Sequence, residues 1–289
     1  MYIKYYSMKK FTYLVLFLLP FVCYSQTHRF IYSYKFIVDS TKIDSLQYEE
    51  TRLEVFDNHT EFVSNIGAKR DSAIANAIKN NESPANVKLS KGLFINNVFK
   101  SKKSTYSIEY VGIQPFKVIQ QPLINWKLTK EKKIIQNYNC QKAEINYGGR
   151  TWEAWFTQDI LIQDGPYVFA NLPGLIVKIN DLQNQHSFLL IENYKVANAV
   201  TNFIYKQYLT PIEINKSEFN KIWNNFKRNP MGATEQFMNI NPGLLNGKSF
   251  DNNGNEIDFT QKKREEKKYV EKQMLKNNNY IDLQLYKTN

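Results

Sequence analysis

The sequence predicts a mainly β protein: a curved antiparallel sheet or partly open barrel with a few helices. Aromatic residues make up 15% of the chain, with 19 Tyr and 19 Phe, and these residue types favour strands. Short segments of alternating apolar and polar residues also follow one another directly, with few helical patterns between them. Consecutive strands pair mainly as antiparallel neighbours, so we do not expect a doubly wound parallel sheet.

Residues 1–25 are predicted to be a signal peptide. A short basic pair precedes an apolar run over residues 11–19, which is too short to span a bilayer. Cys23 and Ser25 place small side chains at the −3 and −1 positions of a cut before Gln26. We therefore expect a secreted or periplasmic protein that is not transmembrane once processed.

The two cysteines are expected to have different fates. Cys23 would leave with the signal peptide, and the bulky Val22 before it argues against a lipidated N-terminus. Cys140 alone then remains, so no intrachain disulfide can form. We expect core packing, and not disulfide bonds, to hold the fold together.

Residues 26–209 are predicted to form one antiparallel β domain. The pattern is clearest from Phe30 to Val38, where Phe30 and Tyr32 lie on one face because side chains alternate along a strand. Further elements are a helix at 67–80 and short strands at 51–56, 61–63, 93–98, 104–111, 116–119 and 123–128.

A hairpin is predicted over residues 139–157. The segments on either side of Gly148-Gly149 both alternate, and two consecutive glycines supply the positive φ angles of a tight turn. Strands at 175–180 and 186–192 form a further expected pair. Pro173 and Gly174, just before that pair, fit a type II turn in which Gly174 takes the left-handed position.

Residues 210–289 are predicted to form a helical and loop-rich C-terminal extension. Apolar residues from Phe219 to Phe226 recur at helical spacing before Pro230. Residues 231–258 are rich in Asn, Gly and Pro and are expected to be loop. Residues 261–276 read as a charged helix with a solvated face. Its lysines also allow peripheral association with a membrane surface.

Four motifs in the middle of the chain together resemble the GLPGLI family. Asn171 replaces the first Gly of the motif that names the family, and Asn tolerates the left-handed region. The resemblance implies a secreted or envelope protein of outer-membrane-bearing bacteria, in a family without an established activity. The motifs, in order, are Tyr138-x-Cys140-x-Lys142-Ala143, Gly149-Arg150-x-Trp152-x-Ala154-Trp155-Phe156-Thr157, Asp164-Gly165-Pro166-Tyr167 and Asn171-Leu172-Pro173-Gly174-Leu175-Ile176.

The common catalytic patterns are not found in the sequence. The three His residues are far apart, so we expect no metal site, and neither a serine elbow nor a glycine-rich phosphate loop is present. Cys140 is expected to be inert, although Lys142 beside it could lower a thiol pKa. Asp159 and Asp164 flank a turn as a glycosidase pair does, but loop Asp residues more often serve turn geometry.

The leading hypothesis is a non-enzymatic envelope protein that binds a ligand or a partner, as an accessory to an outer-membrane transporter or assembly. Its candidate ligand-binding residues are Arg150, Trp152, Trp155 and Tyr167, which join a cation to three aromatic rings. Asn171 to Ile176 are assigned a structural role. The expected partners are an apolar ligand or an envelope protein, with no cofactor and no nucleic acid.

Two alternatives from other functional classes remain open. One is an envelope hydrolase acting on peptides or glycans through Asp159, Asp164 or Cys140. The other is a structural or interaction module that works through the basic tail. A concave pocket that gathers the polar residues would favour the hydrolase, and an apolar cavity would favour ligand binding.

Overall fold

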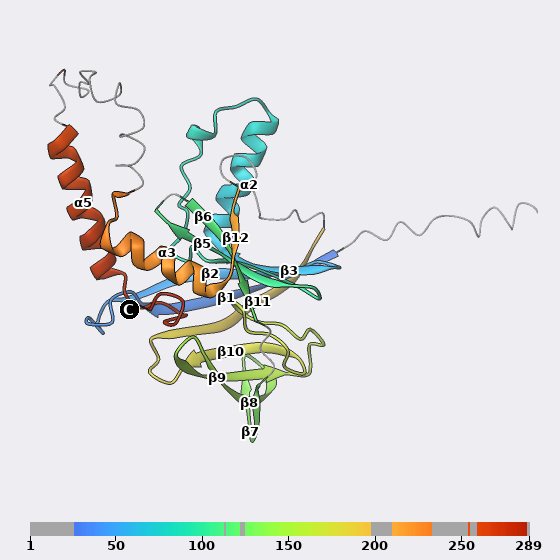
Figure 1. Cartoon of the computed structure of the whole chain (residues 1–289). Helices are drawn as coiled ribbons and strands as arrows, with labels where there is room; N and C mark the ends of the chain where they lie inside the picture. Colours follow the sequence, from blue (N-terminus) through green and yellow to red (C-terminus); the bar gives the residue numbers. More distant parts are fainter. Residues whose placement is uncertain are drawn as a thin grey trace, which may run out of the picture.

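The computed structural model describes residues 26–112, 114–121, 125–197, 210–232, 254 and 259–287. The predicted signal peptide lies outside the described residues, as do residues 123–124 and most of the predicted loop at 231–258. One mainly antiparallel sheet of twelve strands forms the body of the protein (Figure 1). The predicted mainly β fold with a few helices is therefore confirmed.

The sheet runs in the order β12-β6-β5-β4-β3-β2-β1-β11-β10-β9-β8-β7. Its strands are β1 (Gln26–Ile37), β2 (Leu46–Val55), β3 (His59–Ser64), β4 (Asn97–Ser101), β5 (Thr105–Val111), β6 (Gln114–Gln120), β7 (Lys127–Ile135), β8 (Tyr138–Tyr147), β9 (Arg150–Thr157), β10 (Leu175–Asp181), β11 (His186–Ala197) and β12 (Ile212–Ile214). The helices are α2 (Asn65–Lys79), the short 3₁₀ helix η1 (Pro84–Asn86), α3 (Lys216–Arg228) and α5 (Phe259–Lys276).

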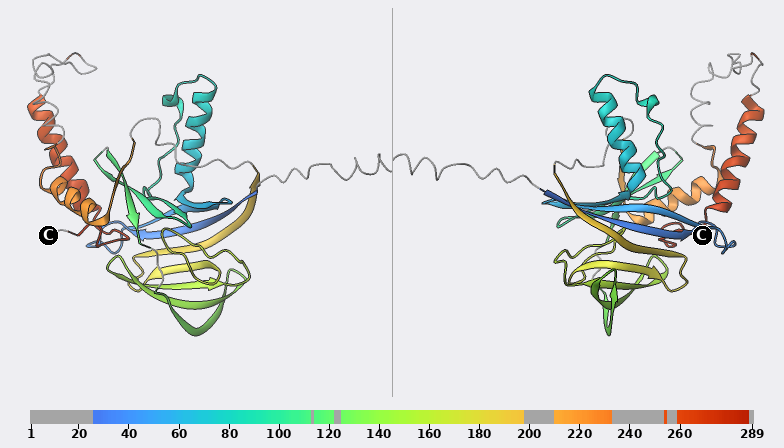
Figure 2. Two further views of the ribbon diagram at one scale, coloured as in Figure 1. Left: turned by 45° about the vertical axis from the view of Figure 1, so that its right-hand side comes forward. Right: turned by 180° about the vertical axis from the view of Figure 1, so that it is seen from behind.

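The sheet curves strongly but does not close over the described residues, where β12 and β7 are its two edges. Strand β1 lies at the centre and pairs along its length with both β2 and β11. Helix α2 stands beyond the β3–β6 part of the sheet, and α5 projects away from the body (Figure 2). The predicted β8–β9 hairpin is confirmed, with Tyr147 opposite Arg150 and φ of 61° and 81° at the two glycines.

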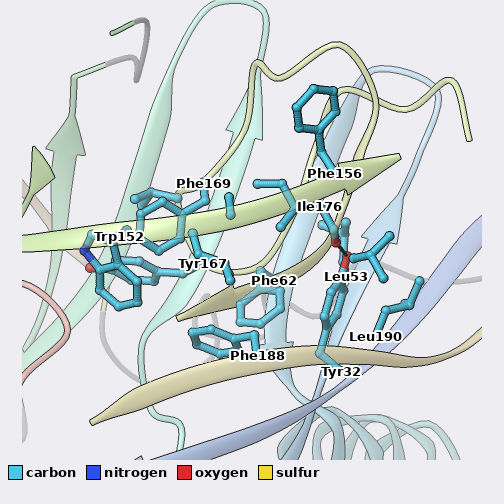
Figure 3. Packing of buried hydrophobic residues seen from close by; sticks show 14 of the residues in the cluster. Tyr32, Leu53, Phe62, Trp152, Phe156, Tyr167, Phe169, Ile176, Phe188 and Leu190 are labelled. Atoms are coloured by element: carbon cyan, nitrogen blue, oxygen red, sulfur yellow. Dashed lines mark hydrogen bonds between the residues drawn. The ribbon is translucent and has the colours of Figure 1, made fainter. Parts of the chain in front are cut away.

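The main core fills the concave face of the sheet. Inward-facing side chains come from β1 to β4 and from β8 to β11. The connection between β9 and β10, residues 158–174, folds into this space and is called the inner loop below. Its Tyr167, Phe169 and Leu172 are at most 2% exposed, and Figure 3 shows Tyr167 and Phe169 among the core side chains of the strands. The inner loop is therefore part of the core.

A second apolar cluster attaches the C-terminal part of the chain to the sheet. Phe219 and Trp223 of α3 pack with Phe116 and Val118 of β6 and with Leu285. Residues 277–287, called the terminal segment below, continue from α5 onto the concave side. The N–H group of Leu283 in this segment donates to the carbonyl of Gly148 at 2.7 Å.

Several strands differ from their predicted bounds; β2 begins at Leu46 and not at residue 51, and β11 extends to Ala197 and not to residue 192. Three further differences have a clear physical reason. Strand β4 begins at Asn97 and not at residue 93, because the N–H groups of Leu93 and Phe94 donate to the Glu49 carboxylate and are not free for a ladder. Strand β7 covers 127–135, a lysine-rich edge in which alternation is weak because both faces meet water. Strand β12 has three residues and pairs parallel to β6, too short to give a sequence pattern.

Candidate functional site

The four predicted ligand-binding residues are all buried. Arg150, Trp152, Trp155 and Tyr167 are 5%, 0%, 5% and 2% exposed. Trp152 and Tyr167 meet through the ring of Phe169, whose centroid is 4.7 Å from the first and 6.1 Å from the second. Trp155 instead lies under the Lys133 ammonium, 3.7 Å from its ring centre. The structure gives these side chains protein contacts, and their ligand-binding role stays a prediction.

Arg150 fastens the terminal segment to the sheet. Its guanidinium donates to the Tyr280 carbonyl at 2.9 and 3.1 Å and to the Asn279 side chain. It also donates to Asp181 at 3.0 Å and to Gln185 at 2.9 Å. Burial lowers the pKa of Arg150, while the carboxylate of Asp181 opposes that shift. Such a saturated, buried guanidinium has a structural role.

The segment Asn171–Ile176 anchors the end of the inner loop. Asn171 has φ of 70°, the left-handed conformation that this residue tolerates. Tyr32 donates from its hydroxyl to the Ile176 carbonyl at 2.8 Å, which ties the segment to β1. Leu172, Leu175 and Ile176 are at most 1% exposed. The geometry agrees with a structural role for this motif.

The predicted type II turn at Pro173-Gly174 is not observed. The Gly174 N–H donates to the Leu172 carbonyl at 2.7 Å, so a tighter three-residue turn is centred on Pro173. Leu175 donates to the carbonyl of Ile160 instead of closing a four-residue turn. Gly174 has φ of 148°, and a Cβ there would lie 1.9 Å from the Thr157 oxygen. Glycine is therefore required at this position for two reasons: φ is positive, and any Cβ would collide with the main chain of β9.

Asp164 belongs to a buried ion pair. Its carboxylate contacts the Lys100 ammonium, and both side chains are under 10% exposed. Lys100 also donates to the carbonyls of Gly165 and Tyr167 at 2.7 and 2.9 Å, and Thr60 donates to Asp164 at 2.6 Å. Burial lowers the pKa of Lys100, and Asp164 opposes the shift. Together these contacts hold the inner loop against β3 and β4.

The other residues of the hydrolase alternative are not brought together. Asp159 is exposed and accepts the Asn139 N–H at 3.2 Å, in keeping with turn geometry. Cys140 is buried in the main core, where burial raises the pKa of its thiol to about 11. Lys142 pairs with Glu131, Glu144 and Glu153. The two cavities described below are not lined by Asp159, Asp164 or Cys140.

A groove of about 680 Å³ lies between α2, the segment after it and the β3–β6 part of the sheet. This volume is in the range of small-molecule sites, roughly 300–1,000 Å³. Its walls include the apolar side chains of Val63, Ala68, Ile74, Phe94, Ile95 and Pro115.

Polar groups also line this α2 groove. The Arg70 guanidinium and the Asp71 carboxylate lie 3.6 Å apart, and each side chain is 28% exposed. Lys91, Asn97 and Tyr110 add further polar groups to the lining. Burial raises the pKa of Asp71, while Arg70 opposes that shift. Ser64, another lining residue, caps α2 by accepting the Gly67 N–H at 3.0 Å. An apolar pocket with charged groups is suited to holding an amphipathic molecule.

Sequence reasoning placed a helix at 67–80 but assigned it no site. The groove needs Phe94 and Ile95 to face that helix, and their approach depends on Glu49 holding the N–H groups of residues 93 and 94. No local pattern encodes such a contact. The only sequence signal for this site is the helical spacing of apolar residues on α2, among them Ala68 and Ile74, which predicts that one face of the helix is covered.

Further findings limit the chemistry. Among the described residues, no group of three or more His, Cys, Asp or Glu side chains is placed to hold a metal ion. Within the same ranges, no helix has the length and apolar character needed to cross a membrane.

Comparison with known proteins gives a distant likeness. No family model matches the chain, and no curated protein matches it. Two solved structures of PNGF-II, in the P21 and C2 space groups, share 15% sequence identity with this chain. The TM-scores are 0.47 and 0.46, and the matches cover 68% of this chain. They span about a third of the other chain, 33% and 32% respectively.

Proposed function

We propose that the protein is a non-enzymatic, ligand-binding envelope protein, exported by the signal peptide predicted at residues 1–25. The α2 groove is its binding site, and the ligand is an amphipathic small molecule. The groove is the observation that carries this proposal, since it is the larger of the two cavities described and has mainly apolar walls. Membership of the GLPGLI family, suggested by the ordered motifs, is part of the same proposal.

The lining chemistry orients the ligand. Ile74 and Phe94 provide apolar contact area for the body of the molecule. Arg70 and Lys91 place positive charge at the groove, while Asp71 offsets part of it. An anionic head near the two cations and an apolar body against α2 satisfy both sets of groups.

A fluorescent probe with the same chemistry tests the proposal. 1-Anilinonaphthalene-8-sulfonate has an apolar body and an anionic group, and we expect one molecule to bind per chain with increased fluorescence. Ile74→Glu puts a charge on the groove wall and should weaken binding at least about tenfold, roughly 1.4 kcal/mol. The matched control is Ala75→Glu on the exposed side of the same helix. Equal binding by the two variants would contradict the assignment of the site.

A further inference from the structure

A second cavity of about 220 Å³ lies on the concave side of the sheet, beneath the terminal segment. It is separate from the α2 groove, although Phe94 and Ile95 line both. Aromatic rings supply much of its wall. They come from β1, from the segment before β4, from the inner loop and from the terminal segment, and include Tyr34, Phe94, Tyr167, Tyr280 and Tyr286.

His186 gives this inner cavity an uncommitted polar group. The side chain is 2% exposed and lines the cavity. Its Nδ1 lies 2.7 Å from the Tyr34 hydroxyl, whereas Nε2 has no hydrogen-bond partner among the described residues. Burial and the nearby Arg150 lower the pKa of His186 to about 3, and the main chain of Asn279 only partly opposes this. The ring is therefore neutral, and its Nε2 can form one hydrogen bond with a ligand.

The charged groups around the cavity are already compensated. Lys216 approaches the Asp282 carboxylate at 2.8 Å, and Tyr147 donates to the same oxygen at 3.1 Å. The Arg150 donors are directed to Asp181 and to the terminal segment, as described above. Among the described residues that line or adjoin the cavity, an anion would thus meet no free cation, and a cation would find no free carboxylate on the wall.

Glu109 lies directly behind the wall. It accepts hydrogen bonds from two lining side chains, Tyr286 at 2.6 Å and Asn96. Its Oε1 has no hydrogen-bond partner within the described ranges. Burial raises the pKa of Glu109 to about 7, so below neutral pH the carboxyl is largely uncharged. The surroundings of the cavity are then polar but close to neutral.

We propose that the inner cavity binds a small, uncharged, polyhydroxylated ligand, namely a single sugar ring. Its aromatic walls can pack against the C–H faces of such a ring, and a ligand hydroxyl can pair with His186 Nε2. An apolar ligand would leave that buried nitrogen unpaired, which is unfavourable. The volume equals that of roughly seven waters at about 30 Å³ each, a size that suits one six-membered sugar.

The cavity has a route to solvent. Leu93 and Ile95 line it on one side and are 57% and 52% exposed. Asn277, at the start of the terminal segment, lines it on another. A ligand of this size can therefore enter at the junction of these two segments, without passage through the packed sheet.

Calorimetric titration of the purified protein tests this site. The probes are glucose, galactose, mannose and N-acetylglucosamine, with choline and inorganic phosphate as a cation and an anion. We expect saturable binding of at least one sugar and none of the two ions. His186→Phe should weaken sugar binding at least tenfold, while His186→Gln, which keeps a polar group, should weaken it less. His59→Phe, outside the cavity lining, is the matched control.

The outcomes separate this proposal from the previous one. Thermal unfolding of each variant shows that it is folded, and a sugar should leave the fluorescence of the probe in the α2 groove unchanged. Failure of all four sugars to bind, preference for choline or phosphate, or unchanged affinity in both His186 variants would overturn the inner site. A crystal structure with sugar that shows only water in the cavity would do the same.

Discussion

The inner loop and the terminal segment both cover the concave face of the sheet, but they are held in different ways. The inner loop inserts apolar side chains such as Phe169 and Leu172 into the main core and adds one buried ion pair. The terminal segment contributes fewer buried apolar side chains, and Arg150, Tyr147 and Lys216 hold it by hydrogen bonds. One element is part of the core, and the other is fastened onto it.

This difference bears on stability. Burial of apolar area stabilises in proportion to that area and does not depend on pH. Buried polar contacts depend on the charge of each partner and become costly when one partner is removed. We therefore expect the inner loop to unfold only with the whole sheet, and the terminal segment to detach in a separate, pH-dependent step.

The largest expected effect is on the inner loop. Lys100→Met leaves the Asp164 carboxylate buried without its cation, which should lower the free energy of unfolding by about 3–5 kcal/mol. Lys127→Met, which removes a cation that is 80% exposed on the edge strand β7, is the control and should cost at most about 1 kcal/mol. Urea unfolding measures both. A loss confined to the loop, with the sheet intact, would contradict its place in the core.

A comparable change at Arg150 should act locally. Arg150→Met removes the donors to Asn279 and Tyr280 and leaves Asp181 buried without its cation, at a cost of about 3 kcal/mol. We expect the terminal segment to become accessible to protease first, while the β strands stay protected from hydrogen exchange. Simultaneous loss of protection in the strands would show that the two regions form one cooperative unit.

The terminal segment should also respond to pH. The pKa of Glu109 rises from 4.5 to about 7 on folding because of burial, with Asp282 adding to the shift. The folded state therefore binds this proton more tightly, and its stabilising effect is complete below about pH 4.5. This contribution to the free energy of unfolding, up to about 3 kcal/mol, is lost as the pH rises from about 4.5 to about 7. Urea unfolding at pH 5 and pH 8 measures the loss, which Glu109→Gln should largely abolish.

The smallest expected effect comes from the turn before β10. Gly174→Ala places a Cβ against the Thr157 carbonyl at a strained φ, so β9 and β10 must separate slightly. We expect the free energy of unfolding to fall by about 2 kcal/mol and the yield of folded protein to be lower. Asn171→Gly, at a φ that both residues accept, should be close to neutral. If thermal unfolding shows Gly174→Ala to be neutral as well, glycine is not needed at that position for stability.

The strands could be predicted because their pattern is local. Alternating aromatics identified β1, and two consecutive glycines identified the β8–β9 turn. The terminal segment could not be predicted, because its partners lie far away in sequence; Arg150 and Tyr280 are 130 positions apart. The contacts of the candidate ligand residues could not be predicted for the same reason. The sequence places Arg150 beside Trp152 but does not show that Asp181, Asn279 and Tyr280 accept the hydrogen bonds that Arg150 donates.

Contact between Gly148 and Asp282 has a consequence for how the protein assembles. A Cβ on Gly148 would lie 2.8 Å from the Asp282 Cα, so the hairpin turn is shaped around a segment that follows every strand in chain order. During synthesis, which proceeds from the N-terminus, the sheet can therefore form before the terminal segment is present. Tyr34 and Tyr167 are then not yet covered by that segment. These rings are shielded from unwanted association only when the terminal segment packs over them.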